Sequence, residues 1–360
     1  MKLNVLFYLI TTGIIAASCN QTPSFKDGIA EEMFVYDTAP FPSCHAATIA
    51  ETPGGLVCAF FGGTKERHPD VCIYVCRLEN GKWTTPMEVA NGIIDEENRQ
   101  PTWNPVLFQI PDGDLLLFYK VGPSPSTWQG MITRSSDNGK TWSQPDSLPK
   151  GYIGPVKNKP VLLSNGTLIC PTSTEGNGWR VHFEMTKDFG KTWSKTDAIN
   201  NPKVYNAIQP SILQYTDGRL QILCRTQNAV VATAWSSDSG KTWGLMQASG
   251  LPNNNSGTDA VSLKDGRQLI VYNHVKTPIG AKKGHRTPLN VAVSKDGKDW
   301  EAALILEDSE ISQYSYPSVI QGADGMVHIV YTWRREKIKY VKVNPSKLKT
   351  KPIIDEKWPL

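Results

Sequence analysis

The 360-residue chain lacks several features that would point to particular classes of protein. It has no run of five like charges, and 38 basic against 34 acidic residues leave a formal net charge of only +4, so nucleic-acid binding is not expected. Only seven cysteines occur, and no histidine–cysteine spacing is typical of a zinc site, so neither a metal nor another cofactor is predicted. No helical periodicity of useful length appears, whereas 29 glycines and 25 prolines favour a turn-rich β protein.

The longest apolar stretch lies at the N-terminus. From Val5 to Ala17 it covers about 13 residues, too few to span a bilayer but typical of the apolar region of an export signal. It ends in Ala-Ala-Ser-Cys at Cys19, which resembles the lipobox of bacterial lipoproteins, although Ala16 stands where leucine is usual. We therefore expect a signal peptide over residues 1–19, lipidation at Cys19, and a flexible tether over residues 20–32. The protein would then be exported and lipid-anchored in a bacterial cell envelope, in the outer membrane or periplasm; ordinary signal cleavage nearby is the alternative.

Six cysteines remain in the body of the chain. An even number in an exported protein permits disulfides. Each of the six, however, lies in a hydrophobic strand pattern, and Cys72 and Cys76 stand too far apart on one strand to bond readily. Buried free thiols are the favoured interpretation.

A short motif recurs along the chain. It reads Ser-Ser-Asp-Asn-Gly-Lys-Thr-Trp at residues 135–142, and it returns at 186–193, at 236–243, in a shortened form at 294–300 and in a worn form at 80–83. The closing tryptophans fall at 83, 142, 193, 243 and 300, so the intervals are 59, 51, 50 and 57 residues. A period near 50 residues with strand-rich content predicts propeller blades or a solenoid. The hydroxyl and the aspartate suit hydrogen bonds to turn backbone, and the glycine suits a positive φ, so the aspartates of these Asp-boxes are predicted to be structural.

Six strand–turn–strand units alternate with the boxes. Their turns are Gly-Gly at 54–55 and Asp-Gly or Asn-Gly at 112–113, 165–166, 217–218, 265–266 and 324–325. Six hairpins and five boxes predict an all-β, six-bladed β-propeller over residues 33–360. The N-terminal strand around Phe34 is expected to pair beside Ile338–Val341 and close the ring, which leaves no free sheet edge there.

Polar and aromatic residues begin all six predicted inner strands. In a propeller these strand starts converge at one end of the central channel, called the mouth below. The positions include His45, Asn104, Lys159, Gln209, Asp259 and the pair Tyr314 and Tyr316. Such a set predicts a functional site at the mouth.

Asp-boxes on six blades resemble the sialidase (neuraminidase) superfamily, in particular its BNR-repeat members. The resemblance covers roughly residues 33–345. It implies two carboxylate-binding arginines at Arg225 and Arg286, a nucleophile at Tyr314 with Tyr316 as its rival, and an acid/base at Asp70.

Two positions depart from that pattern. His45 stands where the resemblance implies the first of three arginines, and Gln209 stands where it implies the glutamate that takes the proton of the tyrosine. An unassisted tyrosine has a pKa of about 10 and is a poor nucleophile at neutral pH. His45 is either a general acid/base or a neutral hydrogen-bonding post.

Further candidates carry less specific signals. His274 ends a strand near Arg286, Lys159 suits a carboxylate or sulfate, and Asp259 is a carboxylate at the mouth by position. Glu175 is a reserve carboxylate on a polar loop. Asn104, Gln209 and Tyr316 are expected to line the substrate site.

Three functions remain open. The first is an exo-acting glycoside hydrolase on an acidic glycan that bears sialic acid or uronate, with Asp70, Tyr314, His45 and Asp259 as candidate catalytic groups. The second is a polysaccharide lyase on a glucuronate-containing chain, with His45, Tyr314, Arg225 and Gln209 in its site. The third is a non-catalytic glycan-binding propeller, which the changes at His45 and Gln209 favour. In each case the partner is an acidic oligosaccharide or polysaccharide, the membrane is contacted only through the lipid, and a monomer is expected.

Overall fold

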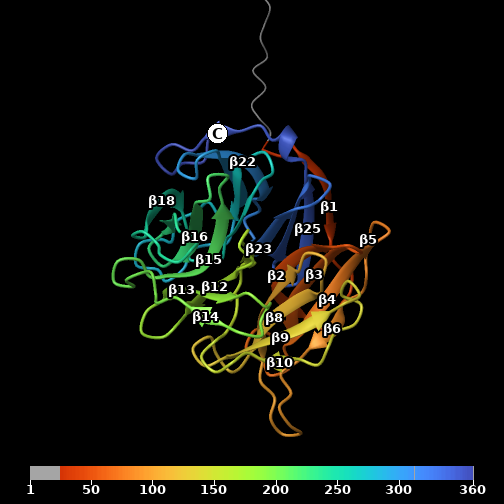
Figure 1. Ribbon diagram of the computed structural model, residues 1–360. Coiled ribbons are helices and arrows are strands. Elements are labelled where there is room, and N and C mark those ends of the chain that lie inside the picture. The colour runs from red at the N-terminus through yellow and green to blue at the C-terminus, as the bar shows by residue number, and fades with distance from the viewer. Residues whose placement is uncertain (1–24, 312, 360) are drawn as a thin grey trace, which may run out of the picture.

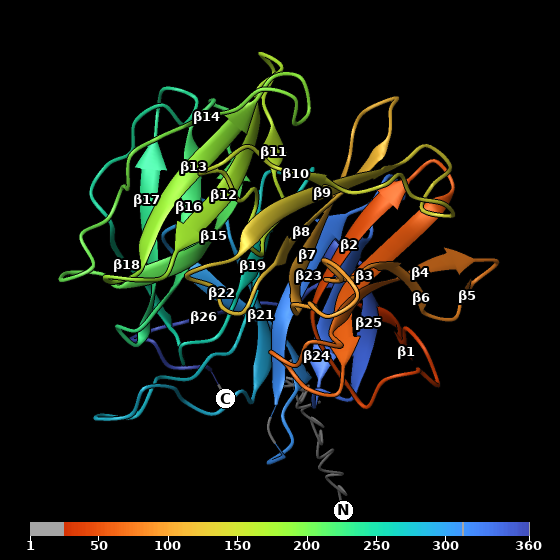
Figure 2. The same ribbon diagram turned by 90° about the horizontal axis from the view of Figure 1, so that it is seen from below.

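The computed structural model describes residues 25–311 and 313–359. Within them the chain forms six antiparallel sheets, the blades, which follow one another around a central axis in chain order (Figures 1 and 2). The predicted export signal, Cys19 and the first part of the predicted tether lie outside the described residues. None of the described residues belongs to a helix with the length and apolarity needed to cross a membrane.

The first three blades take up the first half of the propeller. Blade 1 contains β2 (Ser43–Thr52), β3 (Gly55–Gly63), β4 (Cys72–Glu79), β5 (Lys82–Trp83) and β6 (Met87–Ala90). Blade 2 contains β7 (Thr102–Gln109), β8 (Leu115–Val121), β9 (Gln129–Ser135) and β10 (Asp146–Ser147). Blade 3 contains β11 (Val161–Leu162), β12 (Leu168–Thr174), β13 (Arg180–Thr186) and β14 (Ser194–Lys195).

The last three blades complete the ring. Blade 4 contains β15 (Ala207–Gln214), β16 (Leu220–Thr226), β17 (Val230–Ser236) and β18 (Gln247–Pro252). Blade 5 contains β19 (Asp259–Ser262), β20 (Gln268–Tyr272), β21 (Leu289–Ser294), β22 (Trp300–Glu307) and β26 (Lys351–Pro352). Blade 6 contains β23 (Tyr314–Gln321), β24 (Val327–Trp333), β25 (Lys337–Val343) and β1 (Ile29–Phe34), and the 3-10 helix η1 (Pro345–Lys347) follows β25.

The N-terminal strand closes the ring, as the sequence predicts. β1 pairs antiparallel with β25, with Met33 opposite Tyr340 and Phe34 opposite Lys339. Blade 6 therefore combines the two ends of the chain. The predicted domain start at residue 33 is wrong by four residues, because β1 begins at Ile29. The polar residues of β1 resemble those of a tether in the sequence. They are exposed in the structure because β1 is the outer strand of its blade.

Apolar layers between successive blades form the core. One layer joins blades 6 and 1, with Ile338 and Tyr340 packed together with Cys58 and Phe60. Other layers join blades 1 and 2, blades 3 and 4, blades 4 and 5, and blades 5 and 6. All six cysteines of the described chain are buried and free, which confirms the favoured interpretation of the sequence.

The Asp-boxes lie at the turns between the third and fourth strands of their blades, away from the inner strands. In the box between β13 and β14, the Asp188 carboxylate accepts hydrogen bonds from Lys191 N (3.0 Å), Thr192 N (2.8 Å), Thr192 Oγ1 (2.7 Å) and Thr186 Oγ1 (2.8 Å). Asp137 and Asp238 make the same set of contacts with their own turns. The carboxylate therefore folds the turn on itself, as the local sequence predicts.

Candidate functional site

Four inner strands are interrupted at the level of the mouth. The pairing register shifts in β2, β7, β15 and β23, and one residue in each shift has a positive φ: Ala46, Asn104, Gln209 and Tyr316, at 56°, 34°, 56° and 54°. Bulges of this kind redirect side chains, and a non-glycine residue in the left-handed region costs about 1–3 kcal/mol. Proline follows three of the four, and it has no N–H to donate to the interrupted ladder. The fold thus places strained backbone where the candidate site lies.

Tyr316 lies at the centre of the candidate site. Its hydroxyl accepts hydrogen bonds from Arg225 Nη1 (2.7 Å) and from Gln209 Nε2 (3.3 Å). The Arg286 guanidinium lies 5.5 Å from the centre of the Tyr316 ring, and the His45 ring centre lies 4.1 Å from it. Both predicted arginines therefore meet at one tyrosine, although 61 positions separate them in the sequence.

Arg225 is held from several sides. It is the penultimate residue of β16, where its Nε donates to Asn255 Oδ1 (2.9 Å) and its Nη1 also donates to Gln209 Oε1 (3.4 Å). The guanidinium lies 5.1 Å from the ring centre of Trp179. A planar guanidinium fixed in this way presents its remaining N–H groups in a defined direction.

Arg286 and a further arginine share one acceptor. Arg286 Nη1 donates to Gln313 Oε1 and to Ser315 Oγ (3.3 Å each), and Arg335 Nε donates to the same Gln313 oxygen (3.0 Å). Burial lowers the pKa of Arg286 to about 10, and the charges of Arg225 and Arg335 contribute in the same direction. Arg286 is therefore still cationic at neutral pH. Arg335 also forms an ion pair with Glu66 (2.6 Å).

Sequence reasoning missed Arg335 and Glu66. Arg335 lies in the turn between β24 and β25, and Glu66 lies in the same loop as Asp70. Neither follows a motif of the family that the sequence resembles. Only the ring closure, which brings blade 6 beside blade 1, places them together.

His45 is a buried, neutral side chain that packs against Tyr316. Its Nδ1 shares a hydrogen bond with Thr332 Oγ1 (2.9 Å), and 2% of the residue is exposed. Burial lowers the pKa of His45 well below its usual range, and the nearby cations Arg335, Arg286, Arg225 and Lys157 lower it further. The imidazole is therefore uncharged at neutral pH and supports the Tyr316 ring by packing.

Lys157 forms the floor beneath Tyr316. It reaches across the channel from blade 3 and donates to Thr258 O (2.7 Å) and Pro317 O (2.5 Å), with its Nζ 5.8 Å from the Tyr316 ring centre. Burial lowers the pKa of Lys157 to about 7. A Cβ on Gly257 would come within 3.3 Å of Gln209, Lys157 and Tyr316, so a side chain there would require these neighbours to shift by a few tenths of an ångström.

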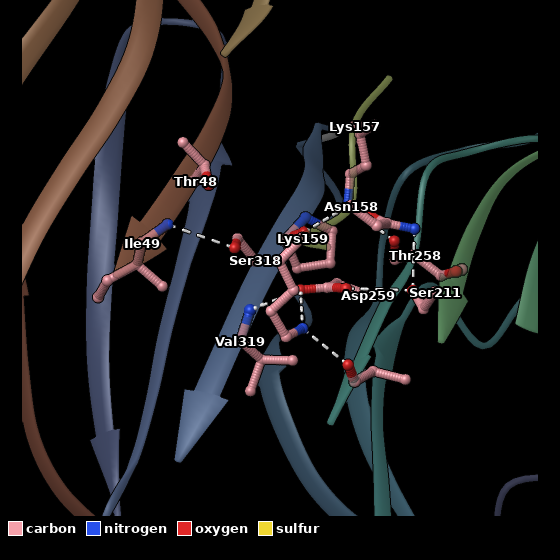
Figure 3. A network of polar contacts seen from close by, with 12 residues as sticks. Thr48, Ile49, Lys157, Asn158, Lys159, Ser211, Thr258, Asp259, Ser318 and Val319 are labelled. Atoms are coloured by element: carbon pink, nitrogen blue, oxygen red, sulfur yellow. Dashed lines mark hydrogen bonds and ion pairs between the residues drawn. The ribbon is translucent and has the colours of Figure 1, made fainter. Parts of the chain in front are cut away.

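Asp259 and Lys159 lie deeper in the channel and bind each other. The Lys159 ammonium lies 2.9 Å from the Asp259 carboxylate, which also accepts hydrogen bonds from Ser211 Oγ (3.1 Å) and Val319 N (2.8 Å) (Figure 3). Asp259 is 1% exposed. The ion pair and its neighbours link blades 3, 4, 5 and 6 inside the channel, which gives both residues a structural role. A catalytic Asp259 and a substrate-binding Lys159 stay predictions.

The Tyr314 side chain does not bond to the guanidinium of Arg225 or Arg286, although its backbone N–H donates to the carbonyl of Arg286 (2.8 Å). It is 1% exposed, belongs to the apolar layer between blades 5 and 6, and its hydroxyl bonds to Ser309 Oγ (2.5 Å). The bulge between Ser315 and Ser318 turns Tyr316, and not Tyr314, toward the mouth. Tyr316 is thus the residue at the predicted position of the nucleophile.

Asp70 and His274 are engaged elsewhere. The Asp70 carboxylate closes its own loop by accepting from Thr64 N (3.0 Å) and Thr64 Oγ1 (2.6 Å) and by contacting His68 Nδ1 (2.8 Å). Partial burial acts to raise the pKa of Asp70, but these partners outweigh burial and lower it. His274 is bonded to Tyr272 Oη (2.5 Å) and to the carbonyl of Glu356 (3.0 Å), so the C-terminal segment covers it. These contacts do not test the acid/base role of Asp70 or the binding role of His274, and both stay predictions.

Together the side chains around Tyr316 form a cluster of cations beside a phenolic hydroxyl, called the cationic cup below. Arg225, Arg286 and Arg335 supply the charge, and Asn104 lies at the equivalent bulge of blade 2. Within the described ranges, no three His, Cys, Asp or Glu side chains are grouped so as to hold a metal ion. Arginine side chains bind carboxylates through paired charge-assisted hydrogen bonds, so the cup suits an anionic ligand.

Comparison with known proteins agrees with this geometry. The BNR repeat-like domain family matches residues 54–329. A protein named sialidase from Bacteroides fragilis is 28% identical over 218 residues, which are 54% of this chain and 38% of the length of that relative. Among solved structures, a Dyadobacter fermentans protein of unknown function superposes with a TM-score of 0.72 at 16% identity, covering 90% of this chain and 99% of the other. The NanB sialidase of Streptococcus pneumoniae superposes with a TM-score of 0.69 at 13% identity, covering 89% of this chain and 71% of the other.

These structural likenesses establish the fold, and the family match extends over most of the propeller, from the first hairpin turn to β24. The chain belongs to the BNR repeat-like domain family, as a divergent member of the sialidase-like superfamily with its six-bladed β-propeller fold.

Proposed function

We propose that the protein is an exo-acting glycoside hydrolase that cleaves an acidic glycan, one that bears sialic acid or a uronate at its end. The observation that carries the proposal is the meeting of Arg225 and Arg286 at the Tyr316 ring, with Arg225 bonded to the hydroxyl. Guanidinium groups in a largely buried cup would hold the carboxylate of a terminal sugar by charge-assisted hydrogen bonds. The relatives named sialidase support a glycan as the substrate.

The reaction would differ from that of an enzyme with a tyrosine–glutamate pair. Gln209 occupies the position beside Tyr316, and an amide does not take up a proton as a carboxylate does. Turnover would therefore depend on electrostatic stabilisation by the arginines and on a separate proton donor. For the same reason a lyase on a glucuronate-containing chain is the second candidate: a lyase does not need a nucleophile activated by Glu.

Product analysis separates the candidates. The purified protein would be incubated with a panel of acidic oligosaccharides and the products followed by mass and by ultraviolet absorbance. A hydrolase adds the mass of one water across its products. A lyase adds no mass and creates an absorbing C=C bond. Binding without either product would leave a glycan-binding propeller and overturn the proposed hydrolysis.

Export and lipid anchoring belong to the same proposal. The apolar stretch from Val5 to Ala17 and the lipobox-like residues before Cys19 support it. A lipid-anchored protein of the cell envelope would meet glycans outside the cytoplasm, which agrees with a glycoside hydrolase.

A further inference from the structure

The turn between β24 and β25 has a strained backbone. It covers residues 333–336 and is closed by a hydrogen bond from Glu336 N to Trp333 O (3.1 Å). Both of its central residues, Arg334 and Arg335, have a positive φ, at 54° and 66°. Asparagine and glycine are preferred at such positions, because larger side chains are strained in the left-handed region. Two arginines keep this conformation only where contacts outside the turn hold them.

Three contacts with other parts of the chain fix Arg335. Its carbonyl accepts from Cys44 N in β2 (2.8 Å), its Nε donates to Gln313 Oε1 (3.0 Å), and its Nη1 donates to Glu66 Oε2 (2.6 Å). Gln313 also holds the turn through its backbone, since its carbonyl accepts from Arg334 N (2.7 Å). The Arg335 guanidinium therefore has a defined position before any ligand arrives.

Gln313 places Arg335 beside the arginines of the cationic cup. The oxygen that accepts from Arg335 Nε also accepts from Arg286 Nη1 (3.3 Å), and the Arg286 guanidinium lies 5.5 Å from the centre of the Tyr316 ring. The Gln313 side chain is an uncharged amide, so it holds the two guanidinium groups together without neutralising either. Neighbouring cations repel each other, and an anion that bonds to both relieves the repulsion.

Glu66 is the carboxylate that meets this arginine. It follows β3 in blade 1, whereas Arg335 belongs to blade 6, so the pair spans the closure of the ring. The Glu66 side chain is 36% exposed and the Arg335 side chain 25%, so water reaches the pair. Ion pairs with this exposure contribute little to stability, and another carboxylate can replace Glu66 at small cost. Gln313 would still hold the Nε of Arg335 after such an exchange.

We propose that Arg335 is a ligand-binding residue of the cationic cup, and that the Glu66 carboxylate occupies its Nη1 until the carboxylate of an acidic sugar takes its place. The identity of the ligand rests on the proposed function, because the acidic glycan supplies the carboxylate. Glu66 is then an internal competitor that lowers the affinity for anionic ligands. An uncharged sugar neither displaces Glu66 nor gains from Arg335, so the two residues together set the selectivity for acidic over neutral sugars.

Binding measured by isothermal titration calorimetry tests this assignment without relying on turnover. The ligands are glucuronic acid and N-acetylneuraminic acid, each compared with its carboxamide. Arg335→Ala should weaken the binding of both acids by roughly 10-fold or more, the size of a lost hydrogen bond to a charged group, and leave the carboxamides unchanged. Glu66→Gln should strengthen the binding of both acids by roughly 2- to 5-fold, the size of an exposed ion pair, and also leave the carboxamides unchanged. A residue that only stabilises the fold gives no such gain.

A double variant and a matched control complete the test. If Glu66 acts only through Arg335, the variant that combines Glu66→Gln with Arg335→Ala should bind the acids as Arg335→Ala alone does. Arg334→Ala is the control, because Arg334 shares the turn and the positive φ but is directed elsewhere: its guanidinium lies 4.3 Å from the Trp333 ring centre and donates to Tyr314 Oη (3.5 Å). This control should bind the acids as the wild type does.

Unchanged or weaker binding of the acids by Glu66→Gln would overturn the assignment and leave the proposed hydrolysis in place. Equal losses on acids and carboxamides in Arg335→Ala, or an equal loss in Arg334→Ala, would do the same. A wild type that binds the acids but yields no product from the oligosaccharide panel would refute hydrolysis and leave the role of Arg335 intact. A folded wild type that binds neither acid would refute the role of Arg335 itself.

Discussion

Replacing Arg225 by alanine should slow the turnover of an acidic glycoside far more than that of its neutral counterpart. Arg225 bonds to Tyr316 Oη at 2.7 Å and is held by Asn255 at 2.9 Å, so its guanidinium is fixed before a ligand arrives. A substrate carboxylate in the cup would accept at least one charge-assisted hydrogen bond from it. The Arg225→Ala variant removes that bond and also leaves the Tyr316 hydroxyl without one donor.

The expected loss in kcat/KM of Arg225→Ala follows from these two effects. A hydrogen bond to a charged group contributes about 1.5–3 kcal/mol, and about 1.4 kcal/mol corresponds to a factor of ten in rate. The charge-dependent part of the loss in kcat/KM is therefore roughly 10- to 100-fold. The part that comes from Tyr316 is the same for a charged and a neutral substrate, so it cancels when the two losses are compared.

The assay measures kcat/KM for the 4-nitrophenyl glycosides of N-acetylneuraminic acid and glucuronic acid and for their carboxamides. Arg219→Ala is the matched control, because Arg219 belongs to the same blade but is exposed and paired with Asp217 in a hairpin turn. We expect wild-type rates from this control. Equal losses of Arg225→Ala on the acid and the amide would show that the arginine does not bind the carboxylate, and the acidic-sugar proposal would be abandoned.

Three other changes test separate parts of the structure. Tyr316→Phe should lower kcat/KM by at least 10-fold because it removes the hydroxyl between Arg225 and Gln209, whereas Tyr314→Phe should retain activity and lose only stability; the reverse order would refute the placement of the site. Asp188→Ala should lower the free energy of unfolding by about 1 kcal/mol, discounted for its partial exposure, with unchanged activity per folded molecule, and a folded but inactive variant would contradict the structural role. Hydrogen bonds lower the pKa of Asp188 to about 2 in the folded state, compared with about 3.9 in the unfolded chain. The stabilisation that the Asp188 carboxylate gives to the folded protein is therefore complete above a pH of about 3.9 and should be lost as the pH falls through about 2. Acid unfolding monitored by circular dichroism would measure this loss. Cys19→Ala should move the protein from the membrane fraction to the soluble fraction of the cell envelope, and a wild-type protein that is already soluble would exclude the anchor.

The sequence alone determined the architecture because the signals for it are local. An Asp-box folds through contacts between residues at most four positions apart, as Asp188 does with Thr192, so each copy can be recognised without its neighbours. The glycine turns are equally local, and the number of boxes and turns together predicts six blades. Ring closure by the N-terminal strand followed because a ring of blades otherwise leaves a free edge.

The site depended on tertiary structure because its contacts join distant parts of the chain. Arg225 and Arg286 could be predicted from motifs, but the choice of Tyr316 over Tyr314 depends on the bulge in β23, which appears only when the strand is paired with β24.

Other contacts of the site region could not be predicted because they join residues that are far apart in the sequence. Asp259 is paired with Lys159, 100 residues away, and Arg335 and Glu66 meet across 269 residues through ring closure. A residue's type and its place at a strand start can suggest chemistry. Whether a charge faces the mouth or is neutralised inside the channel is decided by the side chains that neighbouring blades bring to it.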